Sequence, residues 1–250
     1  MSSHKPKEFI RLLKTFSKDF KLQRNNWLEI GCGNGNVTFF LNQEGFKTIG
    51  IDVEFKKGPF LETLINEKKI IKIKTPEDNR ISVTGNDCLY KWPCEDNSIS
   101  FSFSSSVLEH VINPKQFITE NARILNKKGY ALHYLPSKYA IIEPHVGVLF
   151  GGIFVNKFYY ELMCRIGLCF KRFRNKGQDA YQYMLRATNY YSKSDLIALF
   201  IKSEFEYIGE YTKYIPYYIG PKFTRWISKF KGIIFLFSIF RSHILIFRKI

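Results

Sequence analysis

The sequence predicts an α/β fold, a mostly parallel sheet with helices packed on both of its faces. Short apolar runs alternate with helical patterns over residues 1–135. This alternation is typical of βαβ units, whose strands lie side by side in parallel. A glycine-rich turn at residues 31–35 indicates a strand that turns sharply into a helix. With 45% hydrophobic and 24% charged residues among 250, the chain has the composition of a folded protein with a well-buried core.

Seven short apolar runs are candidate strands. They cover residues 26–30, 47–51, 81–84, 99–104, 130–135, 205–208 and 243–247. A long insertion separates the last two runs. Together they predict a seven-stranded sheet.

Helices are predicted from apolar residues at spacings of three and four, and from residues that favour helix starts. Pro114 lies in the first turn of one predicted helix, and Ser192 is the predicted N-cap of another. The predicted helices cover residues 7–21, 37–42, 114–125, 156–167, 178–187 and 192–201.

The strongest motif is the turn WLEIGCGNG at residues 27–35. Glycines at 31, 33 and 35 allow the backbone to turn tightly and to approach a ligand without an intervening Cβ atom. The spacing differs from the GxGxxG of dinucleotide sites, so no pyrophosphate has to be bound here. The turn fits an amino acid moiety, with Glu29 placed to meet its ammonium group directly or through water. By itself, the turn also fits a purely structural strand-to-helix connection.

Acidic residues after the next two predicted strands strengthen the case for a ligand. Asp52 ends the second run, where its carboxylate can accept hydrogen bonds from both hydroxyls of a ribose. Asp87 follows the third run, where a carboxylate can accept a hydrogen bond from an adenine amino group.

The motifs together resemble S-adenosylmethionine-dependent methyltransferases of the large group that includes the ubiquinone-pathway O-methyltransferases. The matching segments are LEIGCGNG, GIDVE, GNDC, WPCEDNSISFSFSSSVLEHV and ENARILNKKGYALHYLP, over residues 26–136. The resemblance implies a Rossmann-like, seven-stranded methyltransferase sandwich with S-adenosylmethionine as cofactor. Ser100 departs from the family, which usually has an acidic residue there.

Carried over position by position, the resemblance assigns the cofactor residues. It implies Glu29, Gly31, Gly33 and Gly35 around the methionine part, Asp52 at the ribose, Asp87 with Cys88 at the adenine, and Ser104 with Ser105 facing the methyl donor.

Two histidines are candidate catalytic residues. His110, in LEHV, is either a general base near the transferred methyl or a histidine that packs locally at a helix start. His145 lies in EPHVG, which resembles a segment of methyltransferases associated with cell-surface polysaccharide and glycolipid synthesis. Glu143 and His145 there either bind substrate hydroxyls and remove a proton, or hold the loop together.

The net charge of +16 is concentrated in the second half of the chain. No acidic residue follows Glu210, and residues 222–231 interleave basic and aromatic side chains. AT-rich coding explains the abundance of lysine but not this acid-free end. The basic, aromatic-rich C-terminal extension therefore predicts an anionic membrane surface as partner. Nucleic acid and simple packing on the sheet are the alternatives.

We therefore expect a cofactor-binding core at residues 1–135, and a region for the acceptor substrate with the last strands at 136–250. The expected reaction is methyl transfer to a hydroxyl of a small molecule, a sugar or a lipid-linked glycan. RNA methylation and a non-catalytic S-adenosylmethionine-binding scaffold are the alternatives. No metal is expected, and the five cysteines show no CxxC spacing, which predicts free thiols. Without a secretory signal or a long apolar span, the expected location is the cytoplasm or the inner membrane surface.

Overall fold

The computed structural model describes residues 5–73, 91–211 and 239–250. In these residues seven strands form one sheet in the order β3-β2-β1-β4-β5-β7-β6. The strands are β1 Trp27–Ile30, β2 Thr48–Asp52, β3 Ile70–Lys72, β4 Ile99–Ser105, β5 Leu125–Pro136, β6 Phe205–Glu210 and β7 Ser242–Lys249. Strand β7 is antiparallel to both of its neighbours, and the other pairs are parallel. The predicted seven-stranded, mostly parallel α/β sheet is confirmed.

The order of the strands defines where a ligand can bind. From β1 the chain proceeds through β2 to β3 on one side, and β4 then lies on the other side of β1. Chain connections therefore diverge between β1 and β4. In open α/β sheets this switch point opens a crevice at the carboxyl ends of the strands, where ligands bind.

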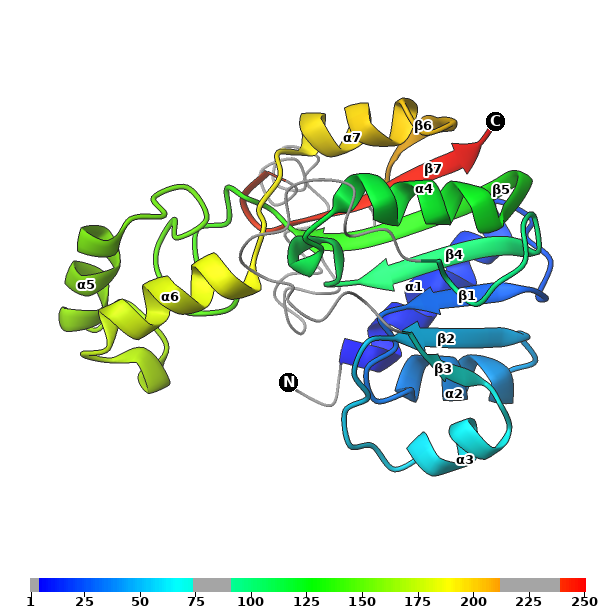
Figure 1. The fold of residues 1–250 in the computed structure, drawn as a ribbon, viewed down its shortest axis with the longest axis horizontal. Helices are drawn as coiled ribbons and strands as arrows, with labels where there is room; N and C mark the ends of the chain where they lie inside the picture. The colour runs from blue at the N-terminus through cyan, green and yellow to red at the C-terminus, as the bar shows by residue number, and fades with distance from the viewer. Residues whose placement is uncertain (1–4, 74–90, 212–238) are drawn as a thin grey trace.

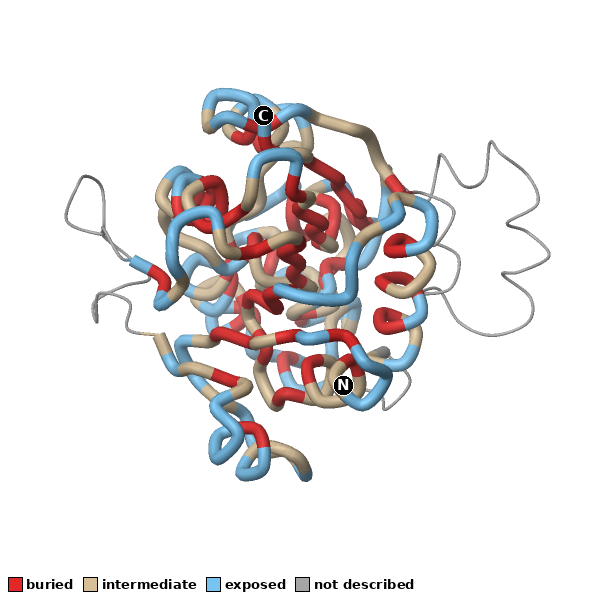
Figure 2. The backbone as a smooth tube through the Cα atoms, turned by 90° about the vertical axis from the view of Figure 1, so that its right-hand side faces the viewer, coloured by how far each residue is buried: buried red, intermediate tan, exposed pale blue. Residues whose placement is uncertain are grey.

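Helices cover both faces of the sheet (Figure 1). On one face, α1 (Lys5–Asp19) and α2 (Asn36–Gln43) pack on Phe101 and Phe103 of β4. On the other face lie α4 (Pro114–Ile124) and α7 (Lys193–Ile201). Because side chains alternate along a strand, β4 directs its phenylalanines to one face and its intervening serines to the other. Buried positions accordingly run through the middle of the molecule (Figure 2).

A second group of helices stands beyond the carboxyl ends of β4 and β5 (Figure 1). It contains α5 (Lys157–Arg165), the short 3-10 helix η3 (Lys171–Phe173) and α6 (Gly177–Ala187). This group has a small core of its own, formed by Val146, Val148, Tyr160, Cys164, Phe173, Ala180 and Met184. We call residues 137–190 the α5–α6 lobe.

Among the α-helices and strands, two were not predicted, α3 (Leu61–Asn66) and β3. Strand β3 has only three residues, too few for a periodic pattern. It is defined by its parallel pairing with β2. The predicted strand 81–84 and the basic, aromatic segment 222–231 lie outside the described residues. Cys32, Cys94, Cys164 and Cys169 are free thiols, as predicted. Within the described ranges, no helix combines the length and apolar character needed to cross a bilayer.

Candidate functional site

The three glycines of the turn after β1 have different surroundings: two are closely packed and one borders open space. Gly31 and Gly35 have positive φ angles of 77° and 75°. A Cβ atom would lie 2.3 Å from a methyl of Val107 at Gly31, and 2.5 Å from a methyl of Leu64 at Gly35. At Gly33 (φ 55°), by contrast, a Cβ atom would meet no described atom within 4 Å. The outer two glycines therefore permit close packing, whereas Gly33 borders open space that a ligand can occupy.

Asp52 borders the same space from the carboxyl end of β2. Its Oδ2 accepts a hydrogen bond of 2.6 Å from the Gly33 amide, and its Oδ1 accepts one of 3.1 Å from the Glu54 amide. The side chain is thus held at the switch point. Each carboxylate oxygen has a second lone pair, so both can still accept a hydroxyl of a ribose.

Glu29 lies inside the turn, where it is 6% exposed. Its Oε2 accepts hydrogen bonds from the amide and the hydroxyl of Thr38, in the first turn of α2, at 2.9 and 2.5 Å. Burial raises the pKa of Glu29 to about 8, although the Thr38 hydrogen bonds oppose that rise. An ammonium group nearby would favour the ionised form, since an opposite charge stabilises it. A contact between Glu29 and the cofactor ammonium stays a prediction.

Ser104 does not lie where the sequence resemblance placed it, facing the methyl donor. It is fully buried under α4, and its hydroxyl lies 2.8 Å from Nδ1 of His133. Strand alternation gives it the same face as Ser102, whose hydroxyl donates to Asn121 of α4. Ser104 is therefore part of the interior and does not face the methyl donor. Ser105, at the end of β4, is half-buried and stays a candidate.

The residues present fit S-adenosylmethionine. Gly33 borders open space, the Asp52 carboxylate lies beside it, and a buried acid in the same turn suits an ammonium group. Gly31, Gly33, Gly35, Asp52 and Glu29 are thus brought together as predicted. Asp87 and Cys88, predicted at the adenine, lie outside the described residues.

A second polar cluster forms where three segments meet at the carboxyl edge of the sheet. They are the 3-10 helix η2 (Leu108–His110) after β4, the loop Glu143–Val146 after β5, and residues 187–190 after α6. The Asn189 amide donates to the Glu109 carbonyl at 2.6 Å, which joins the α5–α6 lobe to η2. The cluster therefore lies between the sheet and the lobe.

Glu143 holds this cluster together. Its Oε2 accepts hydrogen bonds from the amides of His145 (2.8 Å) and Val146 (2.6 Å). Its Oε1 accepts the Tyr190 hydroxyl at 2.6 Å and lies 2.6 Å from Nδ1 of His145. Burial alone would raise the pKa of Glu143, but these hydrogen bonds outweigh burial and lower it. Glu143 thus holds the loop together, which is one of its two predicted roles, and a contact with substrate hydroxyls stays a prediction.

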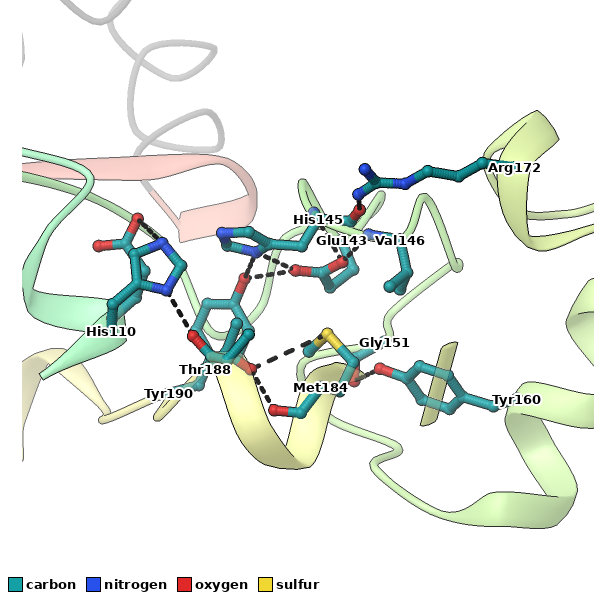
Figure 3. Close-up of polar contacts among 12 residues, drawn as sticks. His110, Glu143, His145, Val146, Gly151, Tyr160, Arg172, Met184, Thr188 and Tyr190 are labelled. Carbon is teal, nitrogen blue, oxygen red and sulfur yellow. Dashed lines mark hydrogen bonds and ion pairs between the residues drawn. The ribbon is translucent and has the colours of Figure 1, made fainter. Parts of the chain in front are cut away.

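The two predicted histidines lie side by side (Figure 3). Their ring centroids are 4.9 Å apart, with the ring planes at 82°. Nδ1 of His110 is bonded to the carbonyl of Ala187 in the α5–α6 lobe. His110 and His145 are 35 positions apart in the sequence, and the meeting of η2 with the EPHVG loop brings them together. Their roles in catalysis stay predictions.

Glu109 is a residue of this cluster that the sequence analysis missed. Its side chain is 1% exposed, and Oε1 lies 3.9 Å from Nε2 of His110. Among the described residues, no group makes a hydrogen bond of normal geometry to its carboxyl oxygens, although the Glu109 amide and the Ser106 hydroxyl lie near them. Burial raises its pKa to about 8. Its position next to His110 was the available signal, but only the fold shows that the side chain is buried.

Comparisons with known proteins show the family of the chain. Residues 1–209 match a family described as methyltransferase domain. The structure is similar to geranyl diphosphate C-methyltransferase from Streptomyces coelicolor A3(2), with 12% identity and a TM-score of 0.53, covering 96% of this chain and 79% of that one. An S-adenosylmethionine-dependent methyltransferase from Mesorhizobium loti gives 10% identity and a TM-score of 0.52, covering 90% of each chain.

A methyltransferase from Aquifex aeolicus gives 14% identity and a TM-score of 0.50, covering 95% of this chain and 89% of that one. At such identities the structural likeness shows the fold. No curated protein sequence matches the chain. The family match spans most of the chain and includes the glycine turn and Asp52. The chain therefore belongs to the methyltransferase domain family and is a class I methyltransferase that uses S-adenosylmethionine as its cofactor.

Proposed function

We propose that the enzyme transfers the methyl group to a hydroxyl of a sugar or lipid-linked glycan at the surface of an anionic membrane. The observation that carries this proposal is the α5–α6 lobe. It joins a polar cluster at the cofactor edge of the sheet to an exposed surface that is both apolar and basic.

The polar cluster gives the lobe a place for the acceptor. His110 and His145 lie at the carboxyl edge, where doubly wound sheets bind their substrates. Their imidazoles offer hydrogen-bonding groups that suit sugar hydroxyls. S-adenosylmethionine supplies an electrophilic methyl on a sulfonium sulfur, so orienting the hydroxyl and excluding water account for most of the protein's contribution.

The outer surface of α5 supports a lipid-linked acceptor. Phe158, Leu162 and Ile166 are 76%, 41% and 55% exposed, and their spacing of four residues puts them on one face of the helix. Most of the other exposed large apolar side chains of the described residues also belong to the α5–α6 lobe. Such a surface is typical of a helix that lies in a membrane interface.

The charge of the α5–α6 lobe suits an anionic surface. Residues 137–190 contain eight Lys and Arg against three Asp and Glu, and one of those acids, Glu143, is buried. Each basic residue near an anionic bilayer contributes about 1 kcal/mol. Reversible binding to the membrane would hold the site next to a lipid-linked acceptor. A related fold accommodates geranyl diphosphate in the Streptomyces coelicolor enzyme.

Methyl transfer tests the acceptor class. The purified protein is incubated with labelled S-adenosylmethionine and with lipid, glycan and RNA fractions of cells. We expect label in the glycan or glycolipid fraction. Label in RNA alone would instead support RNA methylation, and cofactor binding without any transfer would support a scaffold.

Sedimentation with anionic vesicles tests the membrane surface. The double variant Phe158→Ser/Ile166→Ser should bind vesicles roughly tenfold more weakly, because it removes apolar area from the interface. Ile65→Ser/Ile201→Ser is the control, since these apolar residues are also exposed, at 45% and 53%, but lie on α3 and α7. Equal loss in both variants, or no binding by the wild type, would contradict the proposed surface.

A further inference from the structure

Three side chains of the polar cluster converge on one point. Glu109, His110 and His145 each direct one potential ligand atom to within 4.8 Å of the other two. They come from the two loops that follow β4 and β5. The set therefore lies at the carboxyl edge, between the sheet and the α5–α6 lobe.

The hydrogen bonds of the two imidazoles define which nitrogen faces this point. Nδ1 of His145 lies 2.6 Å from the Glu143 carboxylate, and Nδ1 of His110 donates a hydrogen bond to the Ala187 carbonyl. Both acceptors require a proton on Nδ1, which leaves the lone pair of each neutral ring on Nε2. Metal-binding histidines are typically held in this way, with the second ring nitrogen donating to a carboxylate or a backbone carbonyl.

Glu109 supplies the second, independent observation. Its carboxyl group is almost fully buried, and among the described residues no group makes a hydrogen bond of normal geometry to either oxygen; the nearby Glu109 amide and Ser106 hydroxyl only oppose part of the rise in its pKa. A buried carboxyl group without well-aligned partners is costly, because its oxygens have lost their hydrogen bonds to water. The nearest oxygen lies 3.9 Å from Nε2 of His110, which leaves room for an ion between them.

We propose that Glu109, His110 and His145 bind a divalent transition-metal ion, with zinc as the best match. Two imidazoles and one carboxylate form the ligand set of catalytic zinc sites, which keep a fourth position open. Zinc ligands lie about 2.0–2.2 Å from the metal, so tetrahedral ligands are about 3.4 Å apart. Small inward rotations of the three side chains would close the set around an ion. Magnesium is disfavoured, because it prefers oxygen ligands.

The ion would lie close to the cofactor turn. Val107, which packs against Gly31, precedes Glu109 by two residues. The role of the ion rests on the proposed function: the open position takes the acceptor hydroxyl and lowers its pKa. The hydroxyl loses its proton to solvent, its oxygen forms the new bond to the methyl carbon, and the carbon–sulfur bond breaks. The sulfur keeps the electron pair and becomes a neutral thioether.

Metal binding can be measured without any acceptor. Full-length protein without an affinity tag is stripped with a chelator and titrated with zinc chloride by calorimetry. We expect one site per chain and a higher melting temperature with zinc, because an ion that binds only the folded state stabilises it. Cobalt(II) should give visible absorption bands of a low-symmetry site. Failure to bind either ion would overturn the proposal.

Three variants separate the site from adventitious binding. Glu109→Gln should lose zinc affinity while the apo protein keeps its stability, because the amide has nearly the same size and shape as the carboxyl group that it replaces. Glu143→Gln should weaken zinc binding by about 10- to 100-fold through loss of its contact with His145. His243→Gln is the matched control, because His243 also pairs with a buried carboxylate, Glu210, at 2.9 Å. Zinc affinity that is equal in all three variants and the wild type would contradict the site.

The two proposals fail separately. Zinc binding that depends on Glu109, without methyl transfer to glycans or lipids, would leave the metal site standing and contradict the proposed acceptor. Methyl transfer to a glycan by a protein that binds no zinc would support the proposed acceptor and contradict the metal site.

Discussion

Asp52 and Gly33 are joined by a hydrogen bond of 2.6 Å from the Gly33 amide to Oδ2 of Asp52. The bond connects the turn after β1 to the carboxyl end of β2, two of the places where the sequence predicted cofactor contacts. The bond holds the carboxylate beside the open space at Gly33. Changes at either residue are therefore expected to act on binding.

Gly33→Ala should reduce cofactor affinity at a modest cost in stability. The residue has φ 55°, and a Cβ atom added there would have no described atom within 4 Å, so the side chain would fill ligand space and strain the backbone by about 1–2 kcal/mol. Gly45→Ala is the matched control, with φ 82° and equally open surroundings. Both variants should lose similar unfolding free energy in denaturant titrations. Only Gly33→Ala should weaken S-adenosylmethionine binding, and equal affinity in the two variants would contradict this role.

Cofactor binding should release a proton from Glu29. Its pKa of about 8 leaves most of the free protein protonated there at pH 7, and the cofactor ammonium favours the carboxylate. Up to about 0.9 proton per site should be released at pH 7. Calorimetry in phosphate and Tris detects this as a buffer-dependent binding enthalpy. The dependence should disappear in Glu29→Gln, and a wild-type enthalpy that is the same in both buffers would exclude the contact.

His133 should make stability fall at acidic pH. Burial lowers its pKa to about 3, from 6.5 in the unfolded chain. Below pH 6.5 the ring of His133 therefore binds a proton in the unfolded state but not in the folded state. The contribution of the neutral, buried ring to the unfolding free energy is complete above pH 6.5 and is lost as pH falls. At pH 5 the loss is about 2 kcal/mol.

The matched comparison is His133→Gln, which removes the titratable ring. The difference in unfolding free energy between wild type and variant should change by that amount between pH 7.5 and pH 5. The contributions of other titrating groups, including Glu29 and Glu109, to the pH dependence are the same in both proteins and cancel in this difference. A constant difference would show that His133 does not titrate as inferred.

His145→Ala should lower turnover and leave cofactor affinity nearly intact. The residue is anchored by Glu143 and Tyr190 in the EPHVG loop, on a different segment from the glycine turn and Asp52. Steady-state kinetics with the methylated fraction and cofactor titration measure the two effects separately. His243→Ala, which removes a histidine of β7, should keep wild-type turnover. Loss of cofactor affinity in His145→Ala would place this histidine in the cofactor site instead.

The sequence predicted six of the seven described strands, most helices and the cofactor turn, because their signals are local. Glycines at fixed spacing and an acid at the end of a strand describe the turn and Asp52 without any knowledge of the fold. Ser104 was misplaced because which serine of β4 faces α4 depends on the register of the whole sheet. Glu109 was missed because its burial results from packing between η2 and the α5–α6 lobe.

Calorimetric titration of S-adenosylmethionine into the wild type and Asp52→Ala tests the central claim most directly. The wild type should bind one cofactor per chain. Asp52→Ala should weaken binding at least tenfold, because it removes two hydrogen bonds to a charged acceptor, each worth roughly 1.5–3 kcal/mol. NADH should not bind measurably, since the turn lacks the dinucleotide spacing. Equal affinity in both proteins, or tight binding of NADH, would contradict the assignment of this site.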